Sequence, residues 1–321
     1  MKLSSVLISC VPIRTSHPSS RYASKFICTQ GQVLHLFSNA RSCTSVIKDS
    51  FLLLKNFQRA RPVHVYINVN GSICQFIAIV ISKIYRAKVS LWIMDSYPGC
   101  LLYTTKFWLL LYLPFAIFAF FAKLLADNIL VIDEAFIFHF PSTNYSRKKM
   151  KYTPIPFPGI PPSLAPRHHS SSLSIGIIGN LEATFIDNSL FSILQLLNSK
   201  DYNVLIATSK LLPKACQKLS FCEYFTPWNR EDTELVFSKC SSILIPLSAA
   251  RLRYSSPSKI IDCYLRGLQP VILTDHKAWI EESHRKIYKY CITFDQFLSG
   301  IFYTSAELIN YGSLWLSSDS I

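Results

Sequence analysis

Apolar residues in the first half of the chain alternate between two spacings. Short apolar runs, typical of buried strands, are separated by longer stretches whose apolar residues recur at the spacing of an amphipathic helix. The expected strands cover residues 4–10, 33–37, 63–68, 89–94 and 128–132. The expected helices start near Arg21 and cover residues 44–58, 73–85 and 106–126. Strands that alternate with helices of this length predict a parallel, doubly wound sheet.

The second half of the chain repeats the alternation. Strands are expected over residues 173–178, 203–207, 242–246 and 271–273, and helices over residues 188–197 and 232–240. Before the last strand, in the stretch SSPSKIIDCYLRGLQPVI, Ser256 is a candidate N-cap and Pro257 suits the first helical position. Gly267 suits a left-handed C-cap. Lys259 and Asp262 share one helix face near the N-terminus, where free amides and a Lys favour an anion.

A proline-rich stretch separates the two halves. Residues 152–162 read YTPIPFPGIPP, which is typical of a stiff linker. We therefore expect an N-terminal Rossmann-like domain over residues 1–150, a Pro/Ser-rich linker over residues 151–172 and a C-terminal Rossmann-like domain over residues 173–321. Two such α/β domains with doubly wound parallel sheets would face each other across a cleft, which is the natural place for a ligand.

One segment of the first half is unusually apolar. Residues 107–122 contain no charged side chain and lie between Lys106 and Lys123. A membrane span needs about twenty apolar residues. A span over residues 106–126 would also separate the two strands that flank it by a bilayer. We therefore expect a buried or interfacial helix that touches a membrane surface, with a transmembrane span as the alternative.

Charge is distributed unevenly between the two halves. Residues 1–150 hold 17 Lys and Arg against 5 Asp and Glu, whereas residues 151–321 hold 16 against 14. The basic first half calls for an anionic partner, either nucleic acid or an anionic membrane surface. The ten cysteines form no CxxC pair and show no metal-ligand spacing, which indicates reduced core residues in a cytosolic protein. We expect neither a metal site nor a cofactor.

Five sequence motifs follow one another in the order of a known enzyme family. IGIIGNL at residues 175–181 is similar to a strand and glycine turn, and FSKCSSILIPL at residues 237–247 to a helix and strand. Residues 255–272 resemble the signature SPSKxxEYLAxGxPVI, which is the most specific match. ADNILVIDEA at residues 126–135 and LWIMDSYP at residues 91–98 are similar to segments of the first domain. Together they resemble the GT-B glycosyltransferases, most closely the retaining family 4 (group 1) enzymes, over nearly the whole chain.

The resemblance implies that a sugar moves from a nucleotide diphosphate sugar to an acceptor, with retention and without an obligatory metal. Carried over residue by residue, Asp262 matches the acidic residue that holds the donor ribose. Lys259 would meet the diphosphate and stabilise the leaving nucleotide. The other donor-binding candidates are Gly179, Asn180, Arg251, Arg253, Ser256, Pro257 and Ser258. The two arginines would replace basic residues that the family carries after its glycine turn.

In the first half, the resemblance indicates the acceptor side of the site. Asp95 lies where many members carry a catalytic His. The loop that approaches phosphate and acceptor contains His17, a catalytic candidate, and Arg21, a phosphate or acceptor contact. The first acidic residue of the family's E-x7-E motif is Tyr254 here. The replacement of this acidic residue by tyrosine removes or changes one contact with the donor and would therefore affect activity.

Each of these candidates also has a purely structural explanation. Lys259 and Asp262 would also fit a pair on a helix surface, and Asp95 would also fit a loop Asp that caps the next turn. His17 and Arg21 would also fit a solvated loop and the start of a helix.

The favoured function is a hexosyltransferase-like enzyme with a lipid-linked or polysaccharide acceptor. It would act in cell-surface polysaccharide assembly, peripheral to the inner face of the cell membrane. The alternative, raised by Tyr254, is a catalytically degenerate GT-B protein that binds or scaffolds. The positive charge alone would also suit a protein that binds nucleic acid. However, the sequence contains no recognisable nucleic-acid-binding module in which basic and aromatic residues alternate. We therefore expect no nucleic-acid partner.

Overall fold

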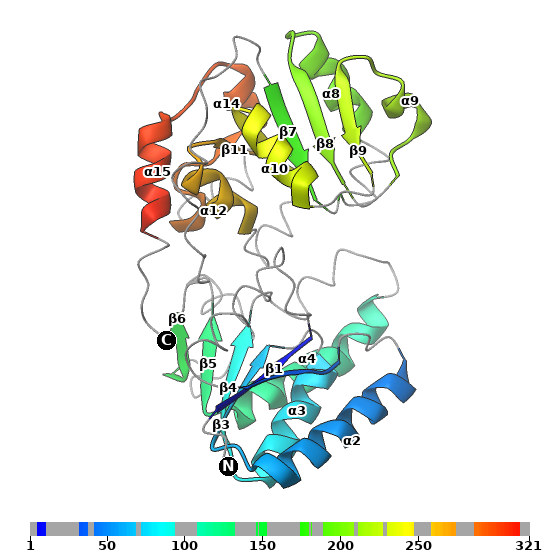
Figure 1. Cartoon of the computed structure of the whole chain (residues 1–321), viewed down its shortest axis with the longest axis vertical. Coiled ribbons are helices and arrows are strands. Elements are labelled where there is room, and N and C mark those ends of the chain that lie inside the picture. Colours follow the sequence, from blue (N-terminus) through cyan, green and yellow to red (C-terminus); the bar gives the residue numbers. More distant parts are fainter. Residues whose placement is uncertain are drawn as a thin grey trace. The chain divides into compact units, whose positions relative to one another are not determined.

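The computed structural model shows two compact units, each built around one sheet (Figure 1). Unit 1 comprises the described residues up to 152, and unit 2 comprises those from 174 onwards. The structure describes residues 5–10, 32–37, 42–68, 72–93, 108–131, 146, 148–152, 174–179, 181, 189–208, 211–226, 230–246, 258–273 and 286–314.

Unit 1 contains a six-stranded parallel sheet with the strand order β2-β1-β3-β4-β5-β6. Its strands are β1 (Ser5–Ser9), β2 (Gln32–His35), β3 (His64–Asn68), β4 (Lys88–Ile93), β5 (Asn128–Val131) and β6 (Met150–Tyr152). The register places Leu7 beside Tyr66 and Leu91 beside Ile129. Strands β1 and β4 bury almost every residue, which is the pattern of parallel strands that are covered on both faces.

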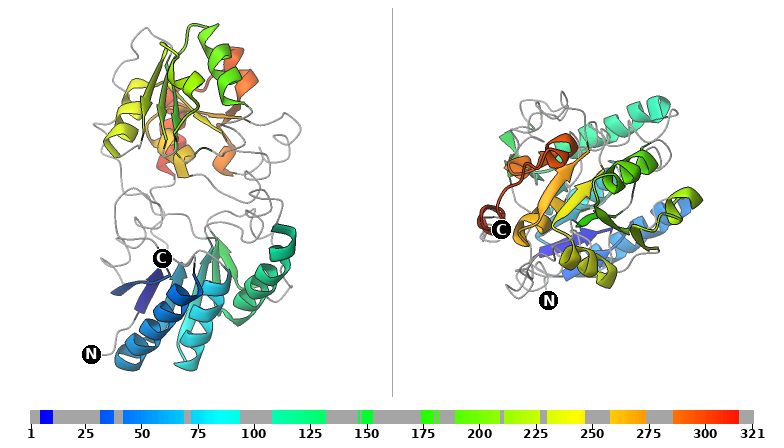
Figure 2. Two further views of the ribbon diagram at one scale, coloured as in Figure 1. Left: turned by 90° about the vertical axis from the view of Figure 1, so that its right-hand side faces the viewer. Right: turned by 90° about the horizontal axis from the view of Figure 1, so that it is seen from above.

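Three helices cover one face of this sheet (Figure 1, Figure 2). They are α2 (Cys43–Ala60), α3 (Ser72–Ile84) and α4 (Trp108–Leu125). Helix α2 leads from β2 to β3, α3 from β3 to β4 and α4 from β4 to β5, so all three connections move across the sheet in the same direction. Because such crossovers are right-handed, the three helices lie on the same face. Helix α3 contacts both α2 and α4. Ser42 caps α2, because its hydroxyl accepts the Ser45 N–H at 3.2 Å.

Unit 2 contains a second six-stranded parallel sheet with the order β12-β11-β10-β7-β8-β9. Its strands are β7 (Ser174–Ile178), β8 (Asn203–Ala207), β9 (Cys222–Phe225), β10 (Ser242–Ile245), β11 (Gln269–Ile272) and β12 (Ile292–Thr293). Strands β7, β10 and β11 are buried along their whole length, so the centre of this sheet is also covered on both faces.

Helices lie on both faces of the second sheet. The helices are α8 (Leu190–Asn198), α9 (Lys214–Gln217), α10 (Arg230–Lys239), α12 (Ser258–Leu265), α14 (Phe294–Leu298) and α15 (Ser305–Ser313), with a short 3-10 helix η3 (Lys286–Tyr288). Helices α8 and α9 lie in connections that move across the sheet from β7 towards β9, whereas α10 and α12 lie in connections that move the opposite way, towards β12. Right-handed crossovers therefore put α10 and α12 on the face opposite α8.

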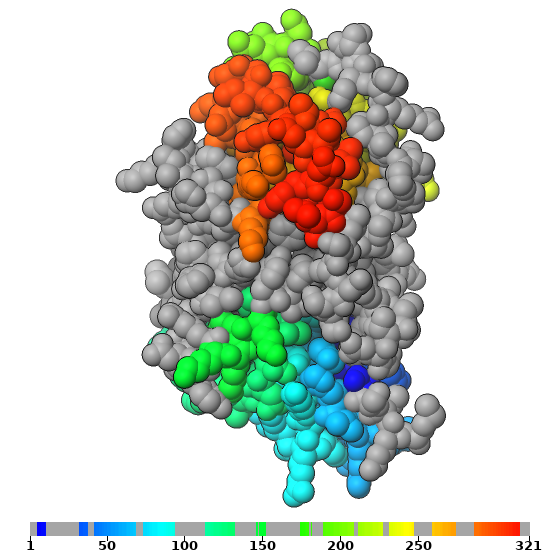
Figure 3. All heavy atoms as spheres, turned by 90° about the vertical axis from the view of Figure 1, so that its left-hand side faces the viewer, coloured from blue at the N-terminus to red at the C-terminus, as the bar shows by residue number. Residues whose placement is uncertain are grey.

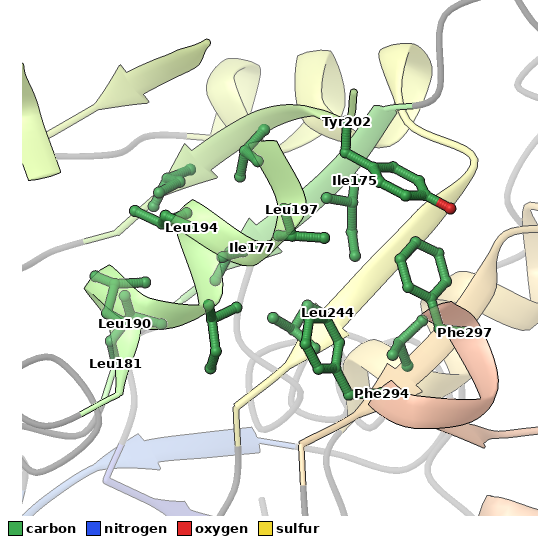
Figure 4. Close-up of a cluster of buried hydrophobic side chains, with 14 of the residues drawn as sticks. Ile175, Ile177, Leu181, Leu190, Leu194, Leu197, Tyr202, Leu244, Phe294 and Phe297 are labelled. Atoms are coloured by element: carbon green, nitrogen blue, oxygen red, sulfur yellow. The ribbon is translucent and has the colours of Figure 1, made fainter. Parts of the chain in front are cut away.

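The core of unit 2 lies between its sheet and α8 (Figure 4). Leu190, Leu194 and Leu197 recur at helical spacing and face the strands, where Ile175 and Ile177 are fully buried. Phe294 and Phe297 of α14 close the same cluster, and the Phe297 ring lies 4.9 Å from that of Tyr202. Burial of the seventeen described side chains of this cluster supplies most of the stability of such a layer.

The predicted fold class is confirmed: both halves of the chain form Rossmann-like, doubly wound parallel sheets. Where a predicted element falls in the described ranges, its ends shift by two residues or fewer. Six further elements were not predicted from the sequence: β6, β9, β12, α9, α14 and α15. Most of these elements are too short to show a periodic pattern. However, α14 and α15 begin with capping boxes, Thr293–Gln296 and Thr304–Glu307, which can be recognised in the sequence. The domain limits and the linker over residues 151–172 stay predictions.

The apolar segment of the first half forms α4, which joins two neighbouring strands of one sheet. Because β4 and β5 pair in parallel, both ends of α4 belong to the same sheet, and a span over residues 106–126 does not fit. Among the residues that the structure describes, we find no helix with the length and apolar character that a membrane crossing needs.

Candidate functional site

The strand order of unit 2 reverses between β7 and β10. The chain runs from β7 to β8 and β9 on one side of this point, and from β10 to β11 and β12 on the other. In a doubly wound sheet the connections diverge at such a point and leave room for a ligand beyond the carboxyl ends of the two strands. Gly179 follows β7, and α12 is the helix after β10. Both elements of the predicted donor site therefore begin at this edge of the sheet.

Gly179 turns the chain directly after β7. Its φ of 111° lies in a region that residues with a Cβ rarely adopt. Its N–H donates to Ala207 O at the end of β8, at 2.7 Å. The Lys259 side chain lies against Gly179, because a Cβ at position 179 would overlap the ammonium group and lie 2.8 Å from Lys259 Cε. The backbone conformation therefore favours glycine here, whereas the tip of the flexible Lys259 side chain could move aside for a methyl group.

Helix α12 brings a cation and a carboxylate to the same edge. Lys259, its second residue, is partly buried, and Asp262, nearly one turn further on, is buried with 7% of its surface exposed. The first amides of a helix have no partners within the helix and carry partial positive charge. Together with the Lys259 ammonium they favour an anionic group beside Gly179. Asp262 adds a carboxylate on the same helix.

An ion pair between the buried Arg266 and the partly exposed Glu234 anchors the C-terminal end of α12 to α10. Arg266 donates from both terminal nitrogens to the Glu234 carboxylate, at 2.8 and 3.0 Å, and only 7% of Arg266 is exposed. Its guanidinium also lies over the Phe237 ring, 4.5 Å from the centroid. A bidentate pair of this kind fixes both distance and angle. It therefore fixes the direction in which α12 presents Lys259.

Helix α15 packs against the opposite side of α12. Gly312 lies so close that a Cβ there would be 2.8 Å from the Leu265 backbone nitrogen. Tyr264, on α12, donates its hydroxyl to Ile287 O at 2.9 Å, and its ring meets that of Tyr311 edge-on. Helix α15 and the segment from residue 286 form adjoining parts of the surface that Figure 3 shows in red and orange. The predicted left-handed C-cap of α12 is confirmed, with a φ of 66° at Gly267.

Unit 1 has an equivalent reversal between β1 and β3. The Cys10 N–H donates to Asn68 O at 3.3 Å and joins the carboxyl ends of the two strands. The chain that contains His17 and Arg21 leaves the sheet at this point, and Asp95 follows shortly after β4. These three residues lie outside the described ranges, so their acceptor-side roles stay predictions.

The structure therefore brings together part of the predicted donor set. Gly179 and Lys259 are in contact, and Ser258 and Asp262 belong to the same helix as Lys259. The remaining candidates lie outside the described residues: Asn180, Arg251, Arg253, Ser256 and Pro257. Tyr254, the departure from the family motif, also lies outside them.

The titratable groups of unit 2 offer no reactive thiol near this edge. Burial raises the pKa of Cys240 to about 12 and raises that of Cys263 well above its ordinary value. Thiols that stay protonated are poor nucleophiles and poor metal ligands. None of the eight described cysteines forms a disulfide, and the described residues contain no cluster of side chains that could hold a metal ion.

Residues that position α12 were not found from the sequence. Glu234 and Arg266 lie 32 positions apart, and nothing in their local pattern announces a pair. Gly312 has a φ typical of any helical residue, so its requirement for a small side chain comes only from the contact with α12. Only a set of related sequences would have shown such long-range constraints.

Neither the family models nor the curated proteins contain a match to this chain. Among solved structures, HepE of Anabaena in complex with UDP and glucose is similar over 97% of this chain and 94% of its own, with 9% identity and a TM-score of 0.61. The lipopolysaccharide outer core galactosyltransferase WaaB matches over 99% and 96%, with 10% identity and a TM-score of 0.59.

A UDP-N-acetylglucosamine 2-epimerase is also similar, over 100% of this chain and 92% of its own, with 11% identity and a TM-score of 0.53. At such identities the likeness concerns the arrangement of the backbone and not the chemistry. All three matches extend over both units, and they agree with the two six-stranded parallel sheets. The chain therefore has the GT-B fold.

Proposed function

We propose that this protein is a glycosyltransferase of the retaining family 4 type, which uses a nucleotide diphosphate sugar and needs no metal ion. The acceptor would be a lipid-linked molecule or a growing polysaccharide at the inner face of the cell membrane. The fold agrees with that of a UDP-bound protein and of a galactosyltransferase. The contact between Lys259 and Gly179 at the reversal point of unit 2 carries the proposal.

The donor diphosphate would lie beside Gly179. The absence of a Cβ lets phosphate oxygens approach the backbone, and the Lys259 ammonium with the first amides of α12 would compensate their charge. Arg251 and Arg253 would contribute further positive charge from the preceding loop. Asp262 would accept hydrogen bonds from the ribose hydroxyls. Asn180 would contact the donor from the turn after Gly179.

Transfer would break the bond between the anomeric carbon and the diphosphate oxygen. The acceptor hydroxyl oxygen would bond to the same face of that carbon, and its proton would leave with the diphosphate oxygen. Negative charge grows on the diphosphate as the bond breaks, so Lys259 would stabilise the transition state more than the ground state. Asp95 and His17 would orient the acceptor hydroxyl, and Arg21 would hold a phosphate of the acceptor.

A second candidate is a protein that binds nucleotide sugars without transferring them. The observation in its favour is Tyr254, which stands where family 4 enzymes carry the first acidic residue of E-x7-E. The similarity to an epimerase adds a further chemistry that the same fold can support. Both alternatives keep the donor site and differ in what happens after binding.

The test is isothermal titration calorimetry with UDP, GDP and their hexose derivatives. The variant is Lys259→Ala, and the matched control is Lys200→Ala, an exposed lysine just before the amino end of β8. We expect micromolar affinity for one of the two nucleotides. Loss of one charge-assisted contact should weaken it about tenfold to a hundredfold in Lys259→Ala, whereas Lys200→Ala should bind as the wild type does.

Binding of neither nucleotide to a folded sample would refute the donor site. If a nucleotide sugar binds, the protein is incubated with that sugar and a cell-envelope lipid extract, and the products are analysed by mass spectrometry. The products distinguish a transferase, an epimerase and a binding protein. A glycosylated lipid or glycan supports transfer, an isomerised donor supports epimerisation, and an unchanged donor supports the binding protein.

A further inference from the structure

Helix α4 presents its larger apolar side chains to the outside of unit 1. The exposed residues are Leu113, Ile117, Phe120, Phe121, Leu124 and Leu125. Their spacing of three and four positions puts them on one stripe of the helix. Leu113 is 65% exposed and Phe120 is 40% exposed. A helix on the outside of a water-soluble domain would carry polar residues along this stripe.

The inward side of α4 has the opposite character. Ala119, Ala122 and Ala126 are buried against the rest of unit 1, and so is Lys123, with only 4% exposed. Lys123 is the sole charged residue of the helix, and burial lowers its pKa to about 8. The small residues and Lys123 are therefore buried on the inward side, whereas most of the large apolar residues are exposed; Phe118 is partly buried and packs against Phe76 of α3. This distribution is the reverse of a helix that is adapted to water on its outer side.

The neighbouring helices extend the apolar surface and add positive charge. On α2, Ile47 and Phe51 are exposed, the latter by 68%, and Lys48 and Lys55 are exposed on the same helix. Helices α2, α3 and α4 lie side by side, and the left view of Figure 2 looks onto this layer. We call the exposed side chains of α2 and α4 the outer face of unit 1.

The carboxylates of unit 1 do little to offset this charge. Residues 1–150 hold 17 Lys and Arg against 5 Asp and Glu. Among the described residues of unit 1 the carboxylates are Asp49 and Asp127. Asp49 accepts the Phe37 N–H at 2.6 Å, and Asp127 accepts from Lys83 and from the Val89 N–H, both at 2.6 Å.

We propose that the outer face of unit 1 docks on a bilayer of anionic phospholipids, with α4 lying in the plane of the interface. Apolar side chains on α4 would enter the boundary between headgroups and acyl chains, and lysines of α2 would meet lipid phosphates. This inference rests on the proposed function only for its purpose, which is to bring the protein to a membrane that carries a lipid-linked acceptor. The binding itself does not depend on transfer.

A second copy of this chain is the other occupant to consider, and charge disfavours it. Two copies that paired through this face would bring two strongly basic domains together, whose repulsion opposes association. An anionic bilayer gains from the same charge. The combination of apolar stripe and basic surroundings therefore favours lipid.

The test is co-sedimentation with phosphatidylcholine vesicles, with or without about a third of phosphatidylglycerol. The apolar variant is Ile117→Gln with Phe120→Gln, and its matched control is Leu211→Gln with Leu314→Gln, two exposed leucines of unit 2. Circular dichroism melting shows whether each variant is folded. Wild type and control should bind anionic vesicles alike, and the apolar variant should bind at least about tenfold more weakly.

A second variant, Lys48→Gln with Lys55→Gln, tests the charge. Each lysine near an anionic surface contributes enough that the pair should weaken binding about tenfold, with a weaker dependence on salt. Equal binding of wild type to neutral and anionic vesicles would overturn the proposal, and so would equal binding of the apolar variant and wild type. A dimer in sedimentation velocity that the apolar variant abolishes would assign the face to a second copy instead.

The same samples separate this proposal from the proposed function. The apolar variant should keep its nucleotide affinity in calorimetry, because unit 2 is unchanged. Lys259→Ala should keep its vesicle binding, because unit 1 is unchanged. Failure of the donor site therefore leaves the membrane result standing, and the reverse also holds.

Discussion

Units 1 and 2 have related sheets but cover them differently. Both sheets have six parallel strands and one reversal of strand order. In unit 2 the helix at the reversal, α12, is held by polar contacts, among them the bidentate pair of the buried Arg266 with Glu234. In unit 1 the corresponding layer of helices leaves apolar side chains exposed and buries Lys123.

The difference shows what topology decides and what it leaves to side chains. A doubly wound sheet places the loops of its central strands at one edge in both units. The helices that flank the sheet are free to differ, because only their inward stripe must fit the strands. Unit 2 uses this freedom to fix the direction of a charged helix. Unit 1 uses it to present an apolar and basic surface.

The largest effect is expected from removing Glu234, the partner of the buried Arg266 in unit 2. Glu234→Ala leaves the Arg266 guanidinium buried without its carboxylate, and should cost about 3 kcal/mol of unfolding free energy in unit 2. Hydrogen exchange with mass spectrometry measures the two units separately. Faster exchange of the protected amides throughout unit 2, with unit 1 unchanged, is the expected result.

The matched comparison is Glu223→Ala, which removes the exposed partner of Lys239 on the same unit. That pair is 3.3 Å long and solvent-exposed, so its loss should change stability by less than about 1 kcal/mol. If both variants lose equal stability, burial is not what makes the Arg266 pair important.

The second prediction concerns the contact between α15 and α12. Gly312→Ala inserts a methyl group 2.8 Å from the backbone of α12 and should destabilise unit 2 by about 2 kcal/mol, although alanine favours helices. Because α12 must shift, nucleotide affinity should also fall. Chemical denaturation and calorimetry measure the two effects.

Gly300→Ala is the control for this change. Gly300 has a φ of 77°, but a Cβ there would meet nothing within 4 Å. It should therefore cost only the strain of the left-handed conformation, about 1 kcal/mol, and leave nucleotide affinity unchanged. A Gly312→Ala protein with unchanged affinity would show that α15 does not position α12.

The third prediction concerns the buried lysine of unit 1. Burial lowers the pKa of Lys123 to about 8, below that of a lysine in the unfolded chain, which is about 10.4. The unfolded chain therefore binds more protons between these values, and stability should rise as pH increases from about 8 to about 10.4. The shift corresponds to about 3 kcal/mol. Lys123→Met should stabilise unit 1 at pH 7 by somewhat less, roughly 2 kcal/mol, because the interactions of the lysine are lost as well.

That gain should disappear near pH 10, where the wild-type lysine is already neutral. Thermal melts of the two proteins across this pH range provide the measurement. Stability curves that stay parallel would show that the Lys123 ammonium is stabilised as well in the folded protein as in water.

The smallest effect is expected at the pair of Lys83 and Asp127. Burial tends to raise the pKa of Asp127, but hydrogen bonds from Lys83 and from the Val89 N–H outweigh it and hold the pKa below its usual value. The stabilisation is therefore present above the pKa of an unfolded aspartate, about 3.9, and is lost as the pH falls through the lower folded-state value. Lys83→Ala should cost about 0.5 kcal/mol at pH 7, because both side chains are partly exposed.

Urea denaturation at pH 7 and at a pH low enough to protonate Asp127 in the folded protein, about 2, checks this prediction. The Lys83→Ala protein should differ from wild type at pH 7 and much less at the acidic pH. A difference that persists unchanged after Asp127 is protonated would mean that Lys83 acts through its apolar stem and not through its charge.

Much of the fold followed from local pattern. Helices as long as α2 and α3 complete several turns, so their apolar spacing was clear, and the strand over residues 203–207 was predicted with its observed limits. Strand β12, with two residues, and helix α9, with four, are too short to repeat any pattern. Their conformation comes from neighbours in the folded chain and not from their own sequence.

The candidate site divides in the same way. Gly179, Lys259 and Asp262 were named from motifs, because turn and helix signals are local. That Lys259 lies against Gly179, 80 positions away, depends on the order of strands in the sheet. The anchoring of α12 by Glu234 and Gly312 depends on it as well.

The sequence by itself determined that this chain forms two doubly wound parallel sheets, that its first half is basic and that residues 107–122 are apolar. These properties are set by composition and by spacing along the chain. Only the tertiary structure decided which side of α4 faces outward and which lysine meets the glycine turn. These two features depend on how segments that are distant in the sequence pack together, because the residues around a side chain are determined by the tertiary fold.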